Sequence, residues 1–234
     1  MRLITWNCKG GFQRKHAAIA SWRPDVLVVP EAARFGGVPQ LADGPRVSSA
    51  YWIGENPRKG LGILSYGDFT LTVDPAYDDT IKWIIPLRVS GPRTFLLLAV
   101  WTVKDHDTGY YITQLMRAVE QYRHMLIAGP AVIAGDFNQS VRLDSPNAPT
   151  FRALVHDLET VGLLSTYHQH CNCQQGEEPD PTFFLHHKPT KPHHLDYVFA
   201  SRDLLARGMN VRVGRHEEWL QLSDHMPVSC TLGE

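Results

Sequence analysis

An excess of charge of one sign is the first property that the sequence lacks. Lysine and arginine number 23 against 24 aspartates and glutamates, so the formal net charge at pH 7 is −1. A protein that coats nucleic acid through bulk electrostatics needs a strong positive field. The composition argues against that class of protein, although it leaves room for a local rim of basic side chains.

The sequence also lacks a hydrophobic run long enough to span a membrane. Residues 1–4 lead straight into a predicted strand, without the pattern of a signal peptide. We therefore expect a soluble, cytoplasmic protein that binds no membrane. The chain has no repeats or low-complexity tracts, and nothing in it indicates an obligate protein partner.

Cysteine is scarce, with four residues in the chain. Cys8 and Cys230 lie in apolar, strand-like contexts, and we predict that both are reduced residues of the core. Cys171 and Cys173 lie in a segment, residues 166–192, that is rich in histidine and proline. This segment is either a polar loop near the rim of a site, which we favour, or a zinc site. Structural zinc ligands usually form two separated pairs, whereas these residues form one compressed patch.

With 234 residues, 43% of them hydrophobic, the chain is long enough for one large core, and we predict a single domain over residues 1–234. Short apolar runs alternate with amphipathic stretches without a linker-like break. This order favours an α/β fold in which helices cover two packed sheets. The predicted helices are residues 15–22, 110–127 and 150–161, and the predicted strands include 26–31, 51–53, 62–65, 69–73, 81–89 and 94–101.

Polar side chains stand at one end of five apolar strands. After the strand 131–134, for example, Asp136 and Asn138 point the same way because side chains alternate along a strand. If the strand ends converge, they form a site of carboxylates, amides and one histidine. That set suits a divalent cation with hard oxygen ligands better than zinc. The residues at the strand ends are Asn7, Glu31, Asp136, Asn138, Asp196, Asp224 and His225.

The motifs that contain these residues form an ordered set: Thr-Trp-Asn at 5–7, Pro-Glu at 30–31, Gly-Asp-Phe-Asn at 135–138, Leu-Asp-Tyr-Val-Phe at 195–199 and Ser-Asp-His at 223–225. Each motif is weak alone. In this order and spacing the set resembles the endonuclease/exonuclease/phosphatase family, which includes DNase I and the exonuclease III-type abasic-site endonucleases. The resemblance covers nearly the whole chain. It implies a four-layer α/β/β/α sandwich of two packed mixed β-sheets, with the site at one edge.

The resemblance further implies metal-dependent hydrolysis of a phosphodiester. Glu31 is the strongest candidate for a metal ligand, because a carboxylate that closes an apolar strand is costly unless a cation pairs with it. Asn7 and Asp224 are the other predicted metal ligands, directly or through water. The expected ion is Mg²⁺, for which Mn²⁺ would substitute.

Four residues are predicted to be catalytic. Asp136 positions the attacking water, and Asn138 donates its amide to a phosphate oxygen. Asp196 orients the imidazole of His225, because a carboxylate bonded to one ring nitrogen fixes the tautomer. His225 acts either as a base or as a cation that binds the phosphate, and the sequence leaves both roles open.

Arg58, Lys59, Trp101 and Thr182 are the predicted substrate-binding residues. Arg58 and Lys59 lie in residues 56–60, which resemble a substrate-edge loop of the family. Thr182 precedes the strand of Asp196 and is expected to contact a phosphate, with a purely structural threonine as the alternative.

Two positions depart from the family pattern. Trp101 stands where members commonly have a histidine or tyrosine near the leaving group. An indole N–H cannot deliver a proton, so His106 or a metal-bound water would have to do so. Lys9 stands where abasic-site endonucleases often carry an acidic residue.

We predict a divalent-metal-dependent phosphodiesterase, and specifically a DNA nuclease with endonuclease or 3′-exonuclease activity. The alternative is a metal-dependent phosphoesterase for a non-polymeric substrate, such as an inositol phosphate or a phospholipid headgroup, which the neutral net charge favours. A third reading is a silent binding module of the same fold. The complete set of acids and histidine argues against it.

Overall fold

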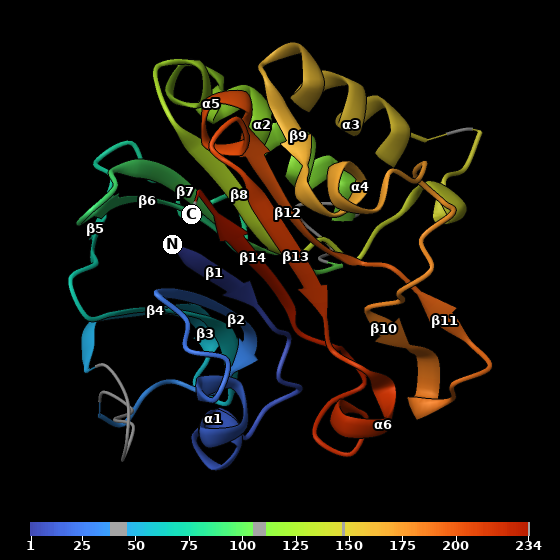
Figure 1. Ribbon diagram of the computed structural model, residues 1–234, viewed down its shortest axis with the longest axis horizontal. Helices are drawn as coiled ribbons and strands as arrows, with labels where there is room; N and C mark the ends of the chain where they lie inside the picture. Colours follow the sequence, from blue (N-terminus) through green and yellow to red (C-terminus); the bar gives the residue numbers. More distant parts are fainter. Residues whose placement is uncertain (38–45, 105–110, 147, 234) are drawn as a thin grey trace.

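Two six-stranded mixed β-sheets pack face to face in the computed structural model, which describes residues 1–37, 46–104, 111–146 and 148–233 (Figure 1). The first sheet has the strand order β13-β14-β1-β2-β4-β3, and the second has the order β5-β6-β7-β8-β12-β9. The first comprises β1 Arg2–Thr5, β2 Val26–Ala32, β3 Val47–Asn56, β4 Lys59–Tyr66, β13 Met209–Val213 and β14 Val228–Leu232. The second comprises β5 Thr70–Val73, β6 Ile84–Ser90, β7 Phe95–Trp101, β8 Ala131–Asp136, β9 Leu163–Ser165 and β12 Asp196–Ser201.

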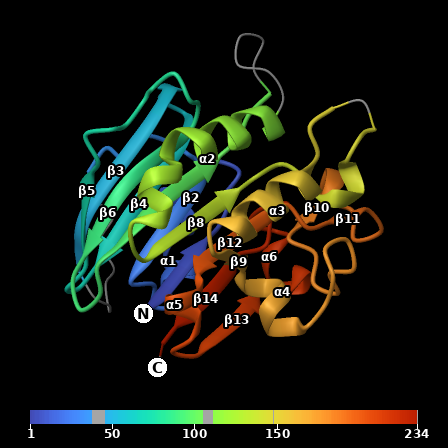
Figure 2. The same cartoon turned by 90° about the horizontal axis from the view of Figure 1, so that it is seen from above.

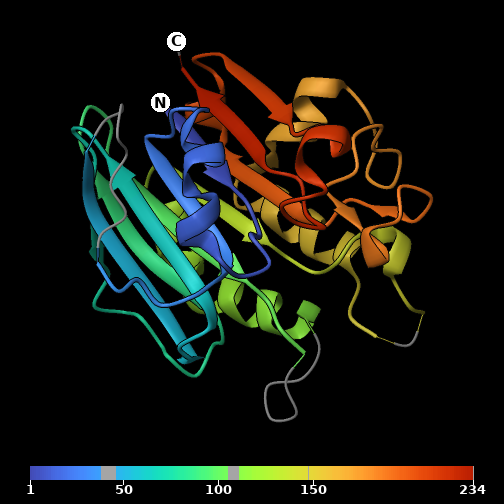
Figure 3. The same cartoon turned by 90° about the horizontal axis from the view of Figure 1, so that it is seen from below.

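Both sheets are apolar on two faces, which places them in the middle of four layers. In β8, Val132 belongs to the core between the sheets, whereas Ile133 belongs to the core under the outer helices. Helices α2 and α3 cover the second sheet (Figure 2), and α1 covers the first (Figure 3). The predicted α/β/β/α sandwich is confirmed. The helices are α1 Phe12–Ala20, α2 Tyr111–Ile127, α3 Phe151–Thr160, α4 Thr166–Cys171, α5 Arg202–Leu205 and α6 His216–Trp219.

Helices α2 and α3 agree with the predicted segments, apart from residue 110, which lies outside the described residues. Helix α1 begins three residues earlier than predicted, because Phe12 is the first buried residue of its apolar face. It starts directly after Gly11, whose φ of 65° lies in the left-handed region, and it ends before Arg23 turns the chain with a φ of 50°. Among the described residues, no helix is long and apolar enough to cross a membrane.

Strands β3 and β4 are longer than the predicted segments 51–53 and 62–65. They pair along a hairpin whose turn consists of Pro57 and Arg58 only, with Asn56 opposite Lys59. The predicted loop 56–60 is therefore the tight end of a hairpin, and Arg58 is exposed at its tip.

The histidine-rich segment after β9 is more ordered than a loop. It contains α4 and a small hairpin of β10 (Phe183–Phe184) and β11 (Pro192–His193). Cys171 and Cys173 form a disulfide with each other, so neither offers a thiolate to zinc. Cys8 and Cys230 are free and buried, which confirms the prediction for both.

A buried contact between a histidine and a glutamate fixes the segment behind β12. His168 Nε2 lies 3.1 Å from Glu178 Oε1, which also accepts the backbone N–H of Gly176 at 2.7 Å. Burial alone would raise the pKa of Glu178, but the hydrogen bonds from His168 and Gly176 outweigh it and lower this pKa from 4.5 to about 2. The carboxylate is therefore more stable as an ion in the folded chain than in the unfolded one.

Replacing Glu178 with glutamine is expected to lower the free energy of unfolding at pH 7 by about 1 to 3 kcal/mol, because hydrogen bonds to a buried charge are lost. Because the pKa of Glu178 is lower in the folded chain, its ionised carboxylate stabilises the fold fully at pH values above the ordinary pKa of 4.5. This stabilisation is lost as the pH falls toward 2. Urea unfolding at pH 7 and pH 3 should show a smaller difference between E178Q and the parent at pH 3. The exposed neighbour Glu177→Gln is the control, and an equal difference at both pH values would contradict the assignment.

Candidate active site

Asp136 and Asp196 are brought together by strand register in the second sheet. Asp136 is the last residue of β8, and its neighbours in the ladder are Trp101 on the parallel strand β7 and Asp196 on the antiparallel strand β12. Both aspartates are fully buried. The convergence expected from the strand-end pattern is therefore present in this sheet.

In the first sheet, the parallel pairing of β1 with β2 carries Asn7 and Glu31 to the same edge. The backbone N–H of Cys8 donates to the carbonyl of Pro30 at 3.1 Å, and that of Gly10 donates to the carbonyl of Glu31 at 3.1 Å. These bonds continue the ladder past the end of β1 and fix the chain around Asn7.

Asn7 connects the two sheets. Its Nδ2 donates to Oδ2 of Asp136 at 2.8 Å, and its Oδ1 accepts the backbone N–H of Lys9 at 3.0 Å. The hydroxyl of Ser223 donates to the carbonyl of Asn7 at 2.7 Å and accepts the backbone N–H of His225 at 3.1 Å. Ser223 thus ties the loop that carries His225 to the loop that carries Asn7.

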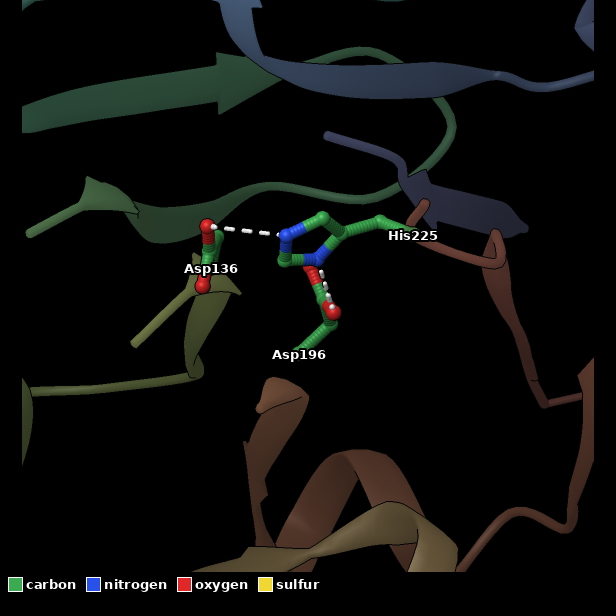
Figure 4. A group of neighbouring side chains, drawn as sticks. All are labelled: Asp136, Asp196 and His225. Carbon is green, nitrogen blue, oxygen red and sulfur yellow. Dashed lines mark hydrogen bonds and ion pairs between the residues drawn. The ribbon is translucent and has the colours of Figure 1, made fainter. Parts of the chain in front are cut away.

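His225 lies buried between two carboxylates (Figure 4). Its Nδ1 is 2.8 Å from Oδ2 of Asp196, and its Nε2 is 3.9 Å from Oδ2 of Asp136. Burial alone would lower the pKa of His225, but the charges of Asp196 and Asp136 outweigh it and raise this pKa to about 9. At neutral pH the ring is therefore an imidazolium that donates from Nδ1 to Asp196.

Amide groups hold the carboxylate of Asp136 from two sides. Oδ1 accepts the backbone N–H of Asn138 at 2.8 Å, and Oδ2 accepts Nδ2 of Asn138 at 3.0 Å in addition to Nδ2 of Asn7. Burial raises the pKa of Asp136, and the charge of His225 opposes that rise. A raised pKa makes this carboxylate a better proton acceptor than an exposed aspartate.

The backbone on both sides of Asp136 tolerates few other residue types. A Cβ at Gly135, where φ is 152°, would lie 1.8 Å from the carbonyl oxygen of Val100, so only glycine lets β8 approach β7 this closely. Asn138 has a φ of 48°, and its Nδ2 also donates to the carbonyl of Thr102 at 2.9 Å. Both amide hydrogens of Asn138 are thus bonded within the protein. These bonds hold the carboxylate of Asp136 in place, and the predicted bond from Asn138 to a substrate phosphate stays a prediction.

Glu31 lies at a bulge in β2, between Val29 and Ala32, with a left-handed φ of 60°. Non-glycine residues in this region are strained and cluster at functional sites. The carboxylate is 20% exposed and forms an ion pair with Nζ of Lys59 at 3.1 Å. The same ammonium lies 5.5 Å from the ring centroid of Trp101.

Asp224, next to His225 in the chain, pairs with the second lysine of the site. Its Oδ2 accepts a hydrogen bond from Nζ of Lys9 at 2.5 Å, and its side chain is 13% exposed. The same ammonium contacts Nε2 of His187 at 2.8 Å. Neither Lys9 nor His187 was among the predicted site residues, because only the fold brings them to Asp224.

Three observations fit a divalent cation with oxygen ligands at this edge. Glu31 and Asp224 each hold a lysine ammonium, so both carboxylates already attract positive charge. Oδ1 of Asp196 is buried and has no hydrogen-bond partner among the described residues. Within the described part of the chain, Asp136, Asp196 and His225 also form a group whose ligand atoms lie within 4.8 Å of one another.

The predicted substrate-binding residues fall into two classes. Arg58 and Lys59 reach the surface, whereas the indole of Trp101 is 5% exposed. Thr182 is fully buried, and its hydroxyl accepts the backbone N–H groups of Leu195 at 2.9 Å and Asp196 at 3.0 Å. This position corresponds to the structural alternative, in which Thr182 supports the strand of Asp196. His106, the other predicted proton donor, lies outside the described residues.

Comparisons with known proteins agree with this geometry. A model of the Endonuclease/Exonuclease/phosphatase family matches residues 4–225, while no curated protein sequence matches the chain. Among solved structures, an AP endonuclease from Archaeoglobus fulgidus has 17% identity and a TM-score of 0.71, with 99% of both chains covered. A 3'-5' exonuclease from Neisseria meningitidis has 20% identity and a TM-score of 0.72, with both chains covered completely. A Neisseria 3' phosphatase bound to a product DNA hairpin has 19% identity and a TM-score of 0.72, again over 100% of both chains.

Proposed function

Because the chain belongs to the endonuclease/exonuclease/phosphatase family and is a hydrolase of phosphodiester bonds, we propose that its substrate is DNA and its metal ion Mg²⁺. The observation that carries the hydrolytic chemistry of this proposal is the buried pairing of His225 with Asp136 at the edge where both sheets meet. Phosphodiester hydrolysis needs a base for the water and positive charge near the phosphoryl oxygens. This pair supplies both.

In the proposed mechanism Asp136 accepts a proton from the water whose oxygen bonds to phosphorus. The imidazolium of His225 stabilises the negative charge on a non-bridging oxygen while the bond from phosphorus to the leaving oxygen breaks, and the leaving oxygen takes a proton from solvent water. Asp196 keeps His225 charged and oriented through Nδ1. Asn7 and Asn138 keep Oδ2 of Asp136 in place through their amide nitrogens.

We assign the metal to Glu31, Asp224 and Asn7, with Mn²⁺ as a substitute for Mg²⁺. Glu31 and Asp224 are 20% and 13% exposed, so an ion can reach them from solvent. A bound divalent ion neutralises the phosphate and polarises its P–O bonds.

Two features support DNA over a small phosphoester. Arg58 and Lys59 place two positive charges at the tip of the β3–β4 hairpin, beside Glu31. The structural relatives in this fold include an enzyme bound to a DNA hairpin. A phosphoesterase for a non-polymeric substrate is the second candidate, and the net charge of −1 favours it.

Neutralising Arg58 and Lys59 together is expected to raise the KM for DNA several-fold with a smaller effect on kcat, since both act on substrate binding. Loss of two phosphate contacts should flatten the plot of log affinity against log salt by about 1.4 to 1.8. The single variant R58A separates binding from metal effects, because Lys59 also pairs with Glu31. R123A, on the outer helix α2, is the matched control for lost charge.

The substrate itself is tested with duplex and single-stranded oligonucleotides beside a small phosphodiester, across a range of salt concentrations with Mg²⁺. Cleavage of DNA that depends on salt supports the proposal. A parent enzyme that cleaves the small diester well but no DNA at any salt would establish the phosphoesterase instead.

A further inference from the structure

Lys9 is held in one orientation by two acceptors from different parts of the chain. Its ammonium donates to Oδ2 of Asp224 at 2.5 Å and contacts Nε2 of His187 at 2.8 Å. The Nδ1 of His187 lies 3.1 Å from the carbonyl of Leu220. A carbonyl accepts only, so Nδ1 carries the proton and Nε2 accepts from Lys9. The direction of each hydrogen bond between the carbonyl of Leu220 and the carboxylate of Asp224 is therefore defined.

Left-handed backbone conformations occur on both sides of the contact between Lys9 and His187. Lys9 has a φ of 49°, and Gly10 and Gly11 follow with φ values of 75° and 65°. On the other side, His186 and His187 have φ values of 58° and 55°. Successive non-glycine residues in the left-handed region are rare, and such strain is typical of functional sites.

The β10–β11 hairpin, which contains His187, is fastened to the chain that carries Asp224 and His225 and lies beside α6 (Figure 1). The backbone N–H of Phe184 donates to the carbonyl of Asp224 at 2.8 Å, and that of Met226 donates to the carbonyl of Thr182 at 2.7 Å. The position of His187 over Lys9 is therefore fixed by the same bonds that fix His225.

An ammonium has three N–H donors, and two of those on Lys9 have acceptors here. The Lys9 side chain is 44% exposed, in contrast to the 6% exposure of His225 and the 0% exposure of Asp136. Lys9 therefore presents a positive charge and one unused donor at the rim of the site. A polynucleotide carries one phosphate at each nucleotide. One phosphate can therefore lie at the buried catalytic pair while a neighbouring phosphate contacts the ammonium of Lys9 at the rim.

We propose that Lys9, oriented by His187 and Asp224, binds a phosphate of the polynucleotide next to the phosphate that is cleaved. This inference rests on the proposed function, because it assigns a subsite to the same substrate. Lys9 contributes affinity and register along the strand, and His187 is a positioning residue that acts through Lys9.

The test measures binding without metal, so that Lys9 is separated from the divalent ion. Fluorescence anisotropy of a labelled oligonucleotide in EDTA is recorded at several salt concentrations. K9M should weaken binding about three- to tenfold and reduce the salt slope by about 0.7 to 0.9, the value of one phosphate contact. K9R should keep the slope, because the charge remains. R123M, which removes a paired charge from α2, should match the parent.

His187 is tested by rescue. H187A should lose part of the affinity that K9M loses, and H187Q should recover it, because a glutamine oxygen accepts from Lys9. In the presence of metal, K9M should lower the ratio of kcat/KM for DNA to kcat/KM for a small diester, which has no neighbouring phosphate. Thermal unfolding of each variant confirms that it is folded.

The possible failures are distinguishable. A parent that hydrolyses neither DNA nor the small diester overturns the proposed function. A parent that hydrolyses both, with K9M unchanged in DNA affinity and salt slope, overturns the subsite alone. Equal loss by K9M on both substrates would place Lys9 at the cleaved phosphate and also overturn the subsite.

Discussion

Replacement of His225 by alanine is expected to lower kcat by about 10³- to 10⁴-fold, the range for a group that acts directly on the reacting atoms. The imidazolium is the one buried positive charge that contacts both Asp136 and Asp196 among the described residues. Its loss removes the stabilisation of the phosphoryl oxygen and leaves two buried carboxylates without their cation. Single-turnover kinetics at saturating substrate measures the effect, with the exposed His124→Ala on α2 as the control.

The same contacts predict how the losses combine. Asp136→Asn keeps the volume of the side chain but removes the proton acceptor, and Asp196→Asn removes the partner of Nδ1. Each single change should cost orders of magnitude in kcat, while the double and triple changes should cost little more, as for residues that act as one unit. If the separate losses multiply instead, the three residues act independently and the proposed unit is wrong. Unfolding curves exclude variants that have lost the fold.

Removal of the metal is expected to abolish hydrolysis. Excess EDTA should reduce the rate to background, and Mg²⁺ or Mn²⁺ should restore it. Glu31→Gln should lower kcat/KM by about 10²-fold or more at fixed Mg²⁺ and raise the Mg²⁺ concentration needed for half-maximal rate, because a neutral amide neutralises less of the ion's charge. Calorimetric titration with Mn²⁺ gives the binding loss without reference to activity.

Glu55→Gln is the matched control for Glu31→Gln, because Glu55 also pairs with a lysine, at 2.5 Å from Nζ of Lys82. Glu55 lies near the end of β3, on the hairpin that carries Lys59, the partner of Glu31. It should leave Mn²⁺ binding unchanged. Full activity of the parent in EDTA, or Mn²⁺ affinity that is equal in E31Q and the parent, would remove Glu31 from the metal site.

The sequence could predict the layers and the meeting of the strand ends, because both follow from periodicity that is local in the chain. Val132 and Ile133 face opposite cores as a strand requires, and Asp136 follows them at the sheet edge. The order of the five motifs then implied which family assembles such strands. Element ends were less accurate, as in α1, where Gly11 rather than any capping side chain sets the start.

Contacts that depend on tertiary geometry could not be read from the sequence. Thr182 resembled a phosphate-binding residue, yet the fold places its hydroxyl under two backbone N–H groups. Asn138 was predicted to donate to substrate, but its bonds to Thr102 and Asp136 depend on tertiary contacts that no motif indicates. The ion pairs of Lys59 with Glu31 and of Lys9 with Asp224 were missed for the same reason. The sequence placed both lysines near the site, but nothing in it assigned either one to these carboxylates.

The bond between Asn7 and Asp136 has a consequence for how this activity can be tuned. Asn7 and His225 come from the first sheet and Asp136 and Asp196 from the second, so the geometry of the pair is set by how the sheets are docked. A change of side-chain volume in the core between the sheets, at Val132 for example, is expected to shift one sheet against the other and to alter the same distances. Turnover and thermal stability are therefore expected to change together when that core is altered. The β10–β11 hairpin shares this constraint, because its backbone is bonded to the chain that carries Asp224 and His225. The exposed tip of the β3–β4 hairpin, at Arg58, is the part of the rim where specificity can change without moving the catalytic pair.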